Sequence, residues 1–279
     1  MEQVVEKLDN INQKLARWRL NPLMLKLKVI ACDVLRREVS WLASRSPCYV
    51  DVSFLPQGLH ATPDKLRALL SEEIEKANQG LPYMHEEKTF YDYIILVYGL
   101  CDNSIVNLSG SRTPLVVPRA HDCITLLLGS KERYRELFDS SPGTYWYSRG
   151  WIECSLQPGE ERYTKTLKSY EEKYGKDNAD YLMEMEQGWF KSYKRAFFID
   201  WEELGNSEYY RSYTKKCAEY LKWTYQEEKG SPALMEKLLS GIFDNDEVLV
   251  IPPGRSIAAS YNETIVVTII EESIIKDIK

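Results

Sequence analysis

The sequence predicts an α/β protein with mainly parallel strands in two Rossmann-like lobes, joined by a helical insertion and preceded by an N-terminal helix. Near-continuous apolar runs such as YDYIILVYGL at 91–100 alternate with amphipathic helical segments, which is typical of strands buried on both faces of a parallel sheet. The same alternation returns after a charged, tyrosine-rich region. The expected divisions are an N-terminal helix at 1–22, a first lobe at 23–155, a helical connection at 156–194 and a second lobe at 195–279.

The N-terminal segment carries one apolar stripe at spacings of four and three residues, which predicts a helix. The helix should end at Asn21-Pro22. Such a helix either packs on its own domain or forms a homodimer or partner contact. The stripe consists of Val4, Leu8, Ile11, Leu15 and Trp18.

Apolar runs and breakers place the remaining elements. The segment TPDKLRALLSEEIEKAN has a capping threonine, a proline in its first turn and one apolar face, so it predicts a helix over 62–78. Gly175 should divide the helical region in two. Parallel strands expose their carboxyl ends at one edge, so we expect the strand ends to face one cleft. These ends fall near residues 31, 55, 98, 117, 199 and 251.

Composition narrows the class of protein. The chain has 279 residues, 44% of them hydrophobic, and a net charge of −6, which argues against nucleic-acid binding because phosphate contacts require basic surface. The charged first twenty residues do not resemble a signal peptide, and no apolar run reaches membrane-spanning length. We therefore expect a cytoplasmic protein without a membrane partner, whose six cysteines are reduced.

Five residues of metal-ligand type follow predicted strands. Cys32 follows the first strand, His60 the second and Cys101 the third, while His121 and Cys123 follow the fourth. Because ligands bind at the carboxyl ends of parallel strands, these side chains should reach one edge of the sheet. The other cysteines are expected to be structural and His85 to face solvent, the residues in question being Cys48, Cys154 and Cys217.

The spacing of these ligand types favours a catalytic or ligand-binding site over a structural zinc finger, because the sequence has no C-x-x-C pair. Two cysteines and a histidine would leave zinc one open position for a substrate. Three cysteines could alternatively hold an iron–sulfur cluster. The adjacent His121 favours zinc. The competing interpretation is that the cysteines are small apolar core residues.

Other candidate residues lie near the same motif. Arg119 could bind a carboxylate or phosphate, and Asp122 could orient His121; each could equally form a surface ion pair. Lys131 opens a helix where an anion could bind. The aromatic segment PGTYWYSRGW at 142–151 suggests either a core-packing loop or a loop over a cleft, with Tyr145 and Trp146 lining it.

Six segments taken in order resemble the domain-of-unknown-function 1638 family over roughly residues 26–257. They are ACDVLRRE, LPQGLH, YDYIILVYGLC, VVPRAHDCITLLLGSKERY, PGTYWYSRGW and VLVIPPG. The resemblance implies an association with corrinoid or methylamine-type methyl metabolism. His121-Asp122-Cys123 is also similar to the His-x-Cys of zinc enzymes that move methyl groups from corrinoids to thiols, although no later cysteine follows in a similar context.

These observations predict a metalloprotein, a zinc-dependent enzyme acting on a small molecule or in thiol or methyl-group transfer. A corrinoid protein or methyltransferase would be its partner. The alternative is a non-catalytic module that binds a corrinoid, nucleotide or anionic metabolite for a partner methyltransferase.

Overall fold

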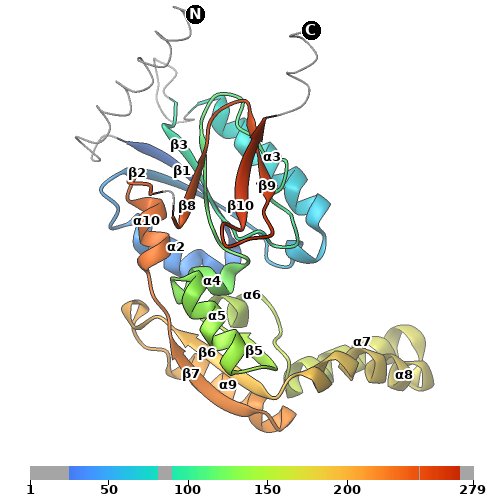
Figure 1. The fold of residues 1–279 in the computed structure, drawn as a ribbon. Helices are drawn as coiled ribbons and strands as arrows, with labels where there is room; N and C mark the ends of the chain where they lie inside the picture. Colours follow the sequence, from blue (N-terminus) through green and yellow to red (C-terminus); the bar gives the residue numbers. More distant parts are fainter. Residues whose placement is uncertain (1–24, 81–89, 245, 271–279) are drawn as a thin grey trace, which may run out of the picture. The chain divides into compact units, whose positions relative to one another are not determined.

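A computed structural model describes residues 25–80, 90–244 and 246–270 (Figure 1). The chain forms two compact units. The first contains the described parts of Met1–Cys32, Val39–Leu126 and Ala233–Lys279, and the second contains Asp33–Glu38 and Leu127–Pro232. The N-terminal helix expected at 1–22 and His85 lie outside the described residues.

The first unit is built on a five-stranded sheet. Its strand order is β2-β1-β3-β4-β8, and all neighbouring pairs are parallel except β4 with β8. The strands are β1 (Lys26–Cys32), β2 (Tyr49–Leu55), β3 (Tyr93–Val97), β4 (Leu115–Pro118) and β8 (Val248–Ile251). The continuous apolar sequences of β3 and β4 explain their central places, because all of their residues are buried.

Helix α3 (Pro63–Asn78) covers one face of this sheet through Leu66, Leu70 and Ile74. The two leucines and the isoleucine lie four residues apart and therefore share one side of the helix. They form a single apolar cluster with Ile30 of β1 and Ile94 of β3. Side chains alternate between the two faces along a strand, so Ile30 and Cys32 of β1 both point to the face that α3 covers.

Shorter elements complete the first unit. An antiparallel hairpin of β9 (Arg255–Ala259) and β10 (Val266–Ile270) follows β8, and α10 (Ala233–Leu239) packs on β3 and β4. Helix α4 (Cys123–Leu128) follows β4, and the 3-10 helix η3 (Leu59–Ala61) follows β2. Helix α2 (Arg36–Ala43) follows β1 after the 3-10 helix η2 (Asp33–Leu35).

The second unit contains a fully parallel sheet of order β5-β6-β7. Its strands are β5 (Thr144–Tyr147), β6 (Arg195–Asp200) and β7 (Thr224–Lys229). The central strand β6 is apolar and buried after its first residue. Its core cluster joins Tyr147 and Phe198 to Tyr210 and Cys217 of α9 (Glu208–Leu221).

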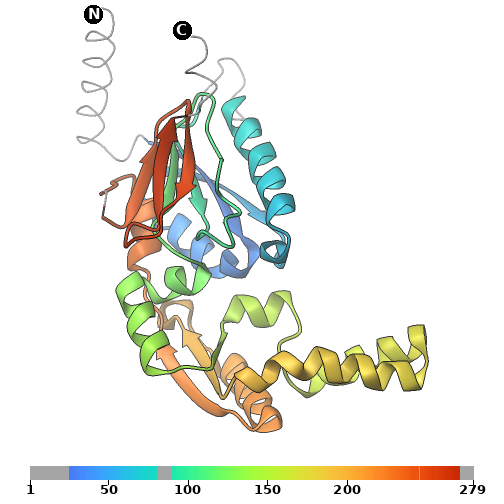
Figure 2. The same ribbon diagram turned by 45° about the vertical axis from the view of Figure 1, so that its right-hand side comes forward.

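Four further helices belong to the second unit. Helices α5 (Lys131–Ser140) and α6 (Arg149–Cys154) flank β5 in sequence. Helices α7 (Glu160–Tyr174) and α8 (Lys176–Gln187) form a hairpin that extends away from the three-stranded sheet (Figure 2). Gly175 breaks the two helices with a φ of 78°, as the sequence predicted. The 3-10 helices η4 (Gly188–Ser192) and η5 (Glu202–Leu204) precede and follow β6.

The expected α/β class is confirmed, and the predicted strand ends agree with the observed ends to within one residue. The division of the chain into units differs from the expected lobes, because β8 was expected in the second lobe but pairs with β4 in the first sheet. Since β8 is antiparallel, Ile251 pairs with Leu115 at the start of β4. The end of β8 therefore lies at the edge opposite to the ends of β1–β4 and cannot face the same cleft.

The segment PGTYWYSRGW also differs from expectation. It forms β5 and the start of α6 rather than a loop, because threonine and the aromatic residues fit a half-buried strand. Within the part of the chain that the structure describes, no helix has both the length and the apolar character needed to cross a membrane.

Candidate functional site at the carboxyl edge of the five-stranded sheet

Three thiols lie at the carboxyl ends of β1, β3 and β4. Cys32 is the last residue of β1, Cys101 lies in the turn after β3, and Cys123 begins α4 after the short loop 119–122 that follows β4. Each is partly exposed, and none of the six cysteines forms a disulfide. Cys32 lies on the α3 side of the sheet, packed against the apolar cluster there. The three thiols therefore come from separate segments to the same edge of the sheet.

Backbone hydrogen bonds hold the loops after β3 and β4 together. The amide of Leu100 donates to the carbonyl oxygen of Ala120 at 2.8 Å, and the amide of Cys101 donates to that of His121 at 2.9 Å. Gly99 permits this approach, since a Cβ at that position would lie 2.4 Å from the backbone nitrogen of Asp122. The positions of Cys101 and Cys123 are thus coupled through paired main chain.

The Cys101 turn adopts an unusual conformation. Cys101, Asp102 and Asn103 have φ angles of 44°, 53° and 64°, which place three successive residues in the left-handed region. The amide of Ser104 donates to the carbonyl oxygens of Leu100 and Cys101, and Arg67 Nη2 donates to that of Asn103 at 2.8 Å. Left-handed residues other than glycine are costly and concentrate at functional sites.

The electrostatic surroundings of the thiols are negative. Burial, reinforced by Asp122 and Cys32, raises the pKa of the Cys101 thiol to about 12. Burial, together with Cys101, Asp122 and Cys32, raises the pKa of Cys123 well above its usual range. Cys32 and Asp122 thus act in the same direction on the pKa of both thiols, and each disfavours the thiolate. At neutral pH the thiols of Cys101 and Cys123 therefore carry their protons unless a bound cation displaces them.

The remaining predicted ligands do not complete a preformed cluster. His60 is exposed in η3, and His121 is exposed at the edge itself. Within residues 25–80, 90–244 and 246–270, no group of three histidine, cysteine, aspartate or glutamate side chains is arranged to hold a metal ion. A metal bound by the three thiols would therefore require their side chains to reorient.

The polar residues predicted beside the His-x-Cys pair have structural contacts. Asp122 Oδ1 accepts from the amides of Ile124 at 2.9 Å and Thr125 at 3.2 Å, so it caps the start of α4. Arg119 Nη1 donates to the carbonyl oxygens of Thr264 at 2.9 Å and of Val266. The guanidinium thus ties β4 to the C-terminal hairpin instead of presenting its fork to a ligand.

The residues predicted to contact a cofactor all belong to the second unit. Lys131 lies 3.9 Å from Glu132 at the start of α5. Trp146 is 8% exposed and packs edge-on against Phe197, with 5.1 Å between ring centroids. Tyr145 packs 5.4 Å from Tyr193. The two aromatic residues are accounted for by packing within the second unit.

Comparison with known proteins gives a family match that covers most of the chain. A family model described as "Protein of unknown function (DUF1638)" matches residues 54–239, which are 186 of the 279 residues. The chain belongs to the DUF1638 family. No curated protein and no solved structure gives a significant match. In this DUF1638 protein the matched region contains Cys101, His121 and Cys123, whereas Cys32 precedes it.

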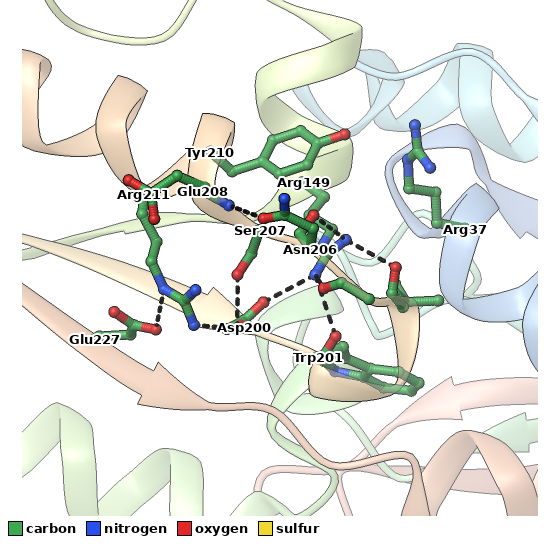
Figure 3. A network of polar contacts seen from close by, with 12 residues as sticks. Arg37, Arg149, Asp200, Trp201, Asn206, Ser207, Glu208, Tyr210, Arg211 and Glu227 are labelled. Carbon is green, nitrogen blue, oxygen red and sulfur yellow. Dashed lines mark hydrogen bonds and ion pairs between the residues drawn. The ribbon is translucent and has the colours of Figure 1, made fainter.

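The DUF1638 protein also contains a buried polar network in its second unit that the sequence did not predict (Figure 3). Arg149 and Asp200 are 3% and 4% exposed, and Arg149 Nη2 donates to Asp200 Oδ1 at 3.1 Å. Asp200 Oδ2 accepts from Ser207 Oγ at 3.0 Å and Arg211 Nη2 at 2.6 Å. The sequence feature that could have indicated this network is the aspartate, Asp200, at the end of the apolar segment FFID.

Arg149 also holds the backbone after β6. Its Nη1 and Nη2 atoms donate to the carbonyl oxygens of Trp201, Leu204, Gly205 and Asn206 at 2.6–3.3 Å. Each arginine of this region faces an acidic partner, because Arg37 pairs with Glu153 at 2.7 Å and Arg211 with Asp200 and Glu227. Balanced charges and backbone contacts indicate a structural network rather than an anion site.

Proposed function

We propose that this DUF1638 protein binds a thiophilic metal ion, with zinc preferred, at the carboxyl edge of the five-stranded sheet. Cys32, Cys101 and Cys123 would supply sulfur ligands, and His121 would be a further ligand or a nearby base. The observation that carries the proposal is that three partly exposed thiols follow the carboxyl ends of three neighbouring parallel strands, and the electrostatic influence of Cys32 on the other two supports it.

The topology supports this location. The order β2-β1-β3-β4 also occurs in one class of doubly wound parallel sheets, whose ligands bind where the strand order reverses, between the first and third strands. Cys32 and Cys101 are the cysteines that follow those two strands. The site would therefore lie where such folds generally place their ligand.

The charge of this edge favours a cation over an anion. Asp122 and Asp102 both act on Cys101 in the direction that disfavours a thiolate. A divalent cation would reverse this effect and deprotonate its sulfur ligands. Soft thiolate ligands select zinc or iron–sulfur clusters over magnesium or calcium.

The proposed activity is zinc-dependent chemistry on a small molecule, or thiol or methyl-group transfer. A bound zinc ion with an open position would act as a Lewis acid or would lower the pKa of a substrate thiol. A corrinoid protein or methyltransferase is the proposed partner, and the cytoplasm, where thiols stay reduced, is the proposed compartment.

Metal analysis of protein purified without oxygen tests this proposal. We expect close to one zinc ion per chain, and cobalt added after zinc removal should give the near-ultraviolet charge-transfer band of cobalt bound to thiolates. A brown protein absorbing near roughly 400 nm would replace zinc with an iron–sulfur cluster. A chain that takes up neither zinc nor cobalt nor a cluster would overturn the metal proposal.

A second candidate function is a non-catalytic module that binds a corrinoid, nucleotide or anionic metabolite for a methyltransferase. It is favoured by the packing of Cys32 against the core and by the absence of a preformed metal group among the described side chains. Titration with cobalamin or ATP distinguishes it. Binding that survives replacement of Cys101 and Cys123 by serine would support the module.

A further inference from the structure

Helix α8 carries an exposed apolar stripe. Tyr181 and Met185 are each 64% exposed, and Trp189, directly after the helix, is 38% exposed. Gly188 keeps helical backbone angles of −55° and −43°, so the three side chains lie at spacings of four residues on one side. We call Tyr181, Met185 and Trp189 the α8 stripe. Large apolar side chains gathered in this way mark interaction sites more often than isolated ones do.

The α7–α8 hairpin is stabilised by other residues. Ala179 and Met183 are the buried side chains of α8, and Glu186 accepts from Arg162 Nη2 at 2.7 Å and from Tyr170 at 3.3 Å. The Arg162 guanidinium lies 5.7 Å from the Trp189 ring centroid. Tyr181 and Met185 are therefore left to solvent in a hairpin that already has its own contacts.

Acidic side chains border the stripe on one flank. Asp177, Asp180 and Glu184 are exposed, and the helical period places them together beside Tyr181. A partner for this surface should have an apolar stripe with basic residues along one side, since flanking charges select partners in helix pairs.

The first twenty residues of the chain have this chemistry. Their sequence places Val4, Leu8, Ile11, Leu15 and Trp18 on one predicted helical stripe, as noted above. Lys7 and Lys14, seven residues apart, border that stripe on one flank. The segment lies outside the described residues.

The oligomeric state shows which copy supplies the segment, because a segment bound within its own chain would leave the protein a monomer.

We infer that the α8 stripe of one molecule binds the N-terminal segment of a second copy, so that two chains exchange these segments in a symmetric dimer. A symmetric exchange forms the same contact twice. This inference is independent of the metal proposal, because it uses neither the thiols nor the edge of the five-stranded sheet.

Light scattering coupled to size exclusion, over a dilution series of the full chain, tests the inference. The wild type should be a dimer. Two double variants, Tyr181→Lys with Met185→Lys and Leu8→Lys with Leu15→Lys, should each weaken dimerisation at least about tenfold. Tyr209→Lys, at a tyrosine that is 68% exposed on α9, is the matched control and should remain dimeric.

Mixing the two double variants gives the sharper readout. Each variant alone has lost both contacts of the symmetric dimer, but a mixed pair retains one intact contact, so differently tagged copies should copurify. Replacing Lys7 and Lys14 by glutamate should weaken the dimer. Replacing Asp177, Asp180 and Glu184 by lysine in the same chain should restore it. A monomeric wild type would overturn the inference, as would a dimer that persists in the α8 variant because N-terminal segments pair with each other.

Discussion

The amide of Cys101 donates to the carbonyl oxygen of His121 at 2.9 Å, which joins the loop after β3 to the loop after β4. Two segments twenty residues apart in the sequence therefore hold their cysteines in a fixed relation to one backbone. Because the next residue, Asp122, also caps α4, a change in this pairing would move the start of the helix and Cys123 with it.

Gly99→Ala should destabilise the protein and disturb the cysteine edge. The added Cβ would lie 2.4 Å from the nitrogen and 2.6 Å from the Cα of Asp122, and backbone atoms cannot yield as a side chain can. We expect a loss of about 1–3 kcal/mol in the free energy of unfolding, measured by urea denaturation. Gly188→Ala is the control, because nothing lies within 4 Å of that position. Equal stability of the two variants would contradict the close approach.

Arg149→Lys should destabilise the second unit. Lysine keeps the charge but cannot reach the aspartate and the four carbonyl oxygens that the guanidinium binds, so buried acceptors lose their donors. We expect a loss of about 3 kcal/mol or more in urea unfolding. Arg36→Lys, in an exposed pair with Asp33, should cost less than about 0.5 kcal/mol. A difference too small to measure between the variants would show that the network contributes little.

Glu38 should make stability depend on pH. The residue is 2% exposed, and its Oε2 has no hydrogen-bond partner among the described residues. Burial raises the pKa of Glu38 to about 7, while Arg149 and Arg37 lower it and Glu153 raises it. The folded state therefore holds a proton that the unfolded state releases near pH 4.5.

This proton stabilises the folded state at low pH, and its contribution is lost as the pH rises from about 4.5 through 7. The full loss is about 3 kcal/mol. Glu38→Gln should remove this dependence, so the stability of the variant relative to wild type should increase from pH 5 to pH 8 in urea titrations. The exposed Glu171→Gln should show no such trend. Parallel curves for Glu38→Gln and wild type would refute the assignment.

The local sequence predicts much of the fold. The apolar runs that form β1, β3, β4 and β6 predict buried strands, and Gly175 predicts the break between α7 and α8. Strand β7 was missed because TYQEEK is a polar, mostly exposed edge strand without an apolar signature. The place of β8 depends on its pairing with β4 more than one hundred residues earlier, which no local pattern encodes.

The candidate site was predictable only in part, because the sequence indicates where strands end but not where side chains point. Strand ends are readable, so Cys32, Cys101 and Cys123 could be assigned to one edge. Side-chain direction is not readable, and Arg119 points to backbone carbonyls of the C-terminal hairpin. The left-handed turn at Cys101–Asn103 gives only a weak signal, because Asp and Asn tolerate this conformation but three successive non-glycine residues rarely adopt it.

Metal content per folded chain in cysteine variants tests the central claim most directly. Wild type, Cys101→Ser, Cys123→Ser and the buried control Cys48→Ser are purified without oxygen, assayed for zinc and iron, and melted thermally. We predict that Cys101→Ser and Cys123→Ser lose the metal with little change in the fold, while Cys48→Ser retains it. If Cys123 is only a core thiol, serine would instead cost about 1–3 kcal/mol of stability. A destabilised Cys123→Ser that still binds metal fully would contradict the account.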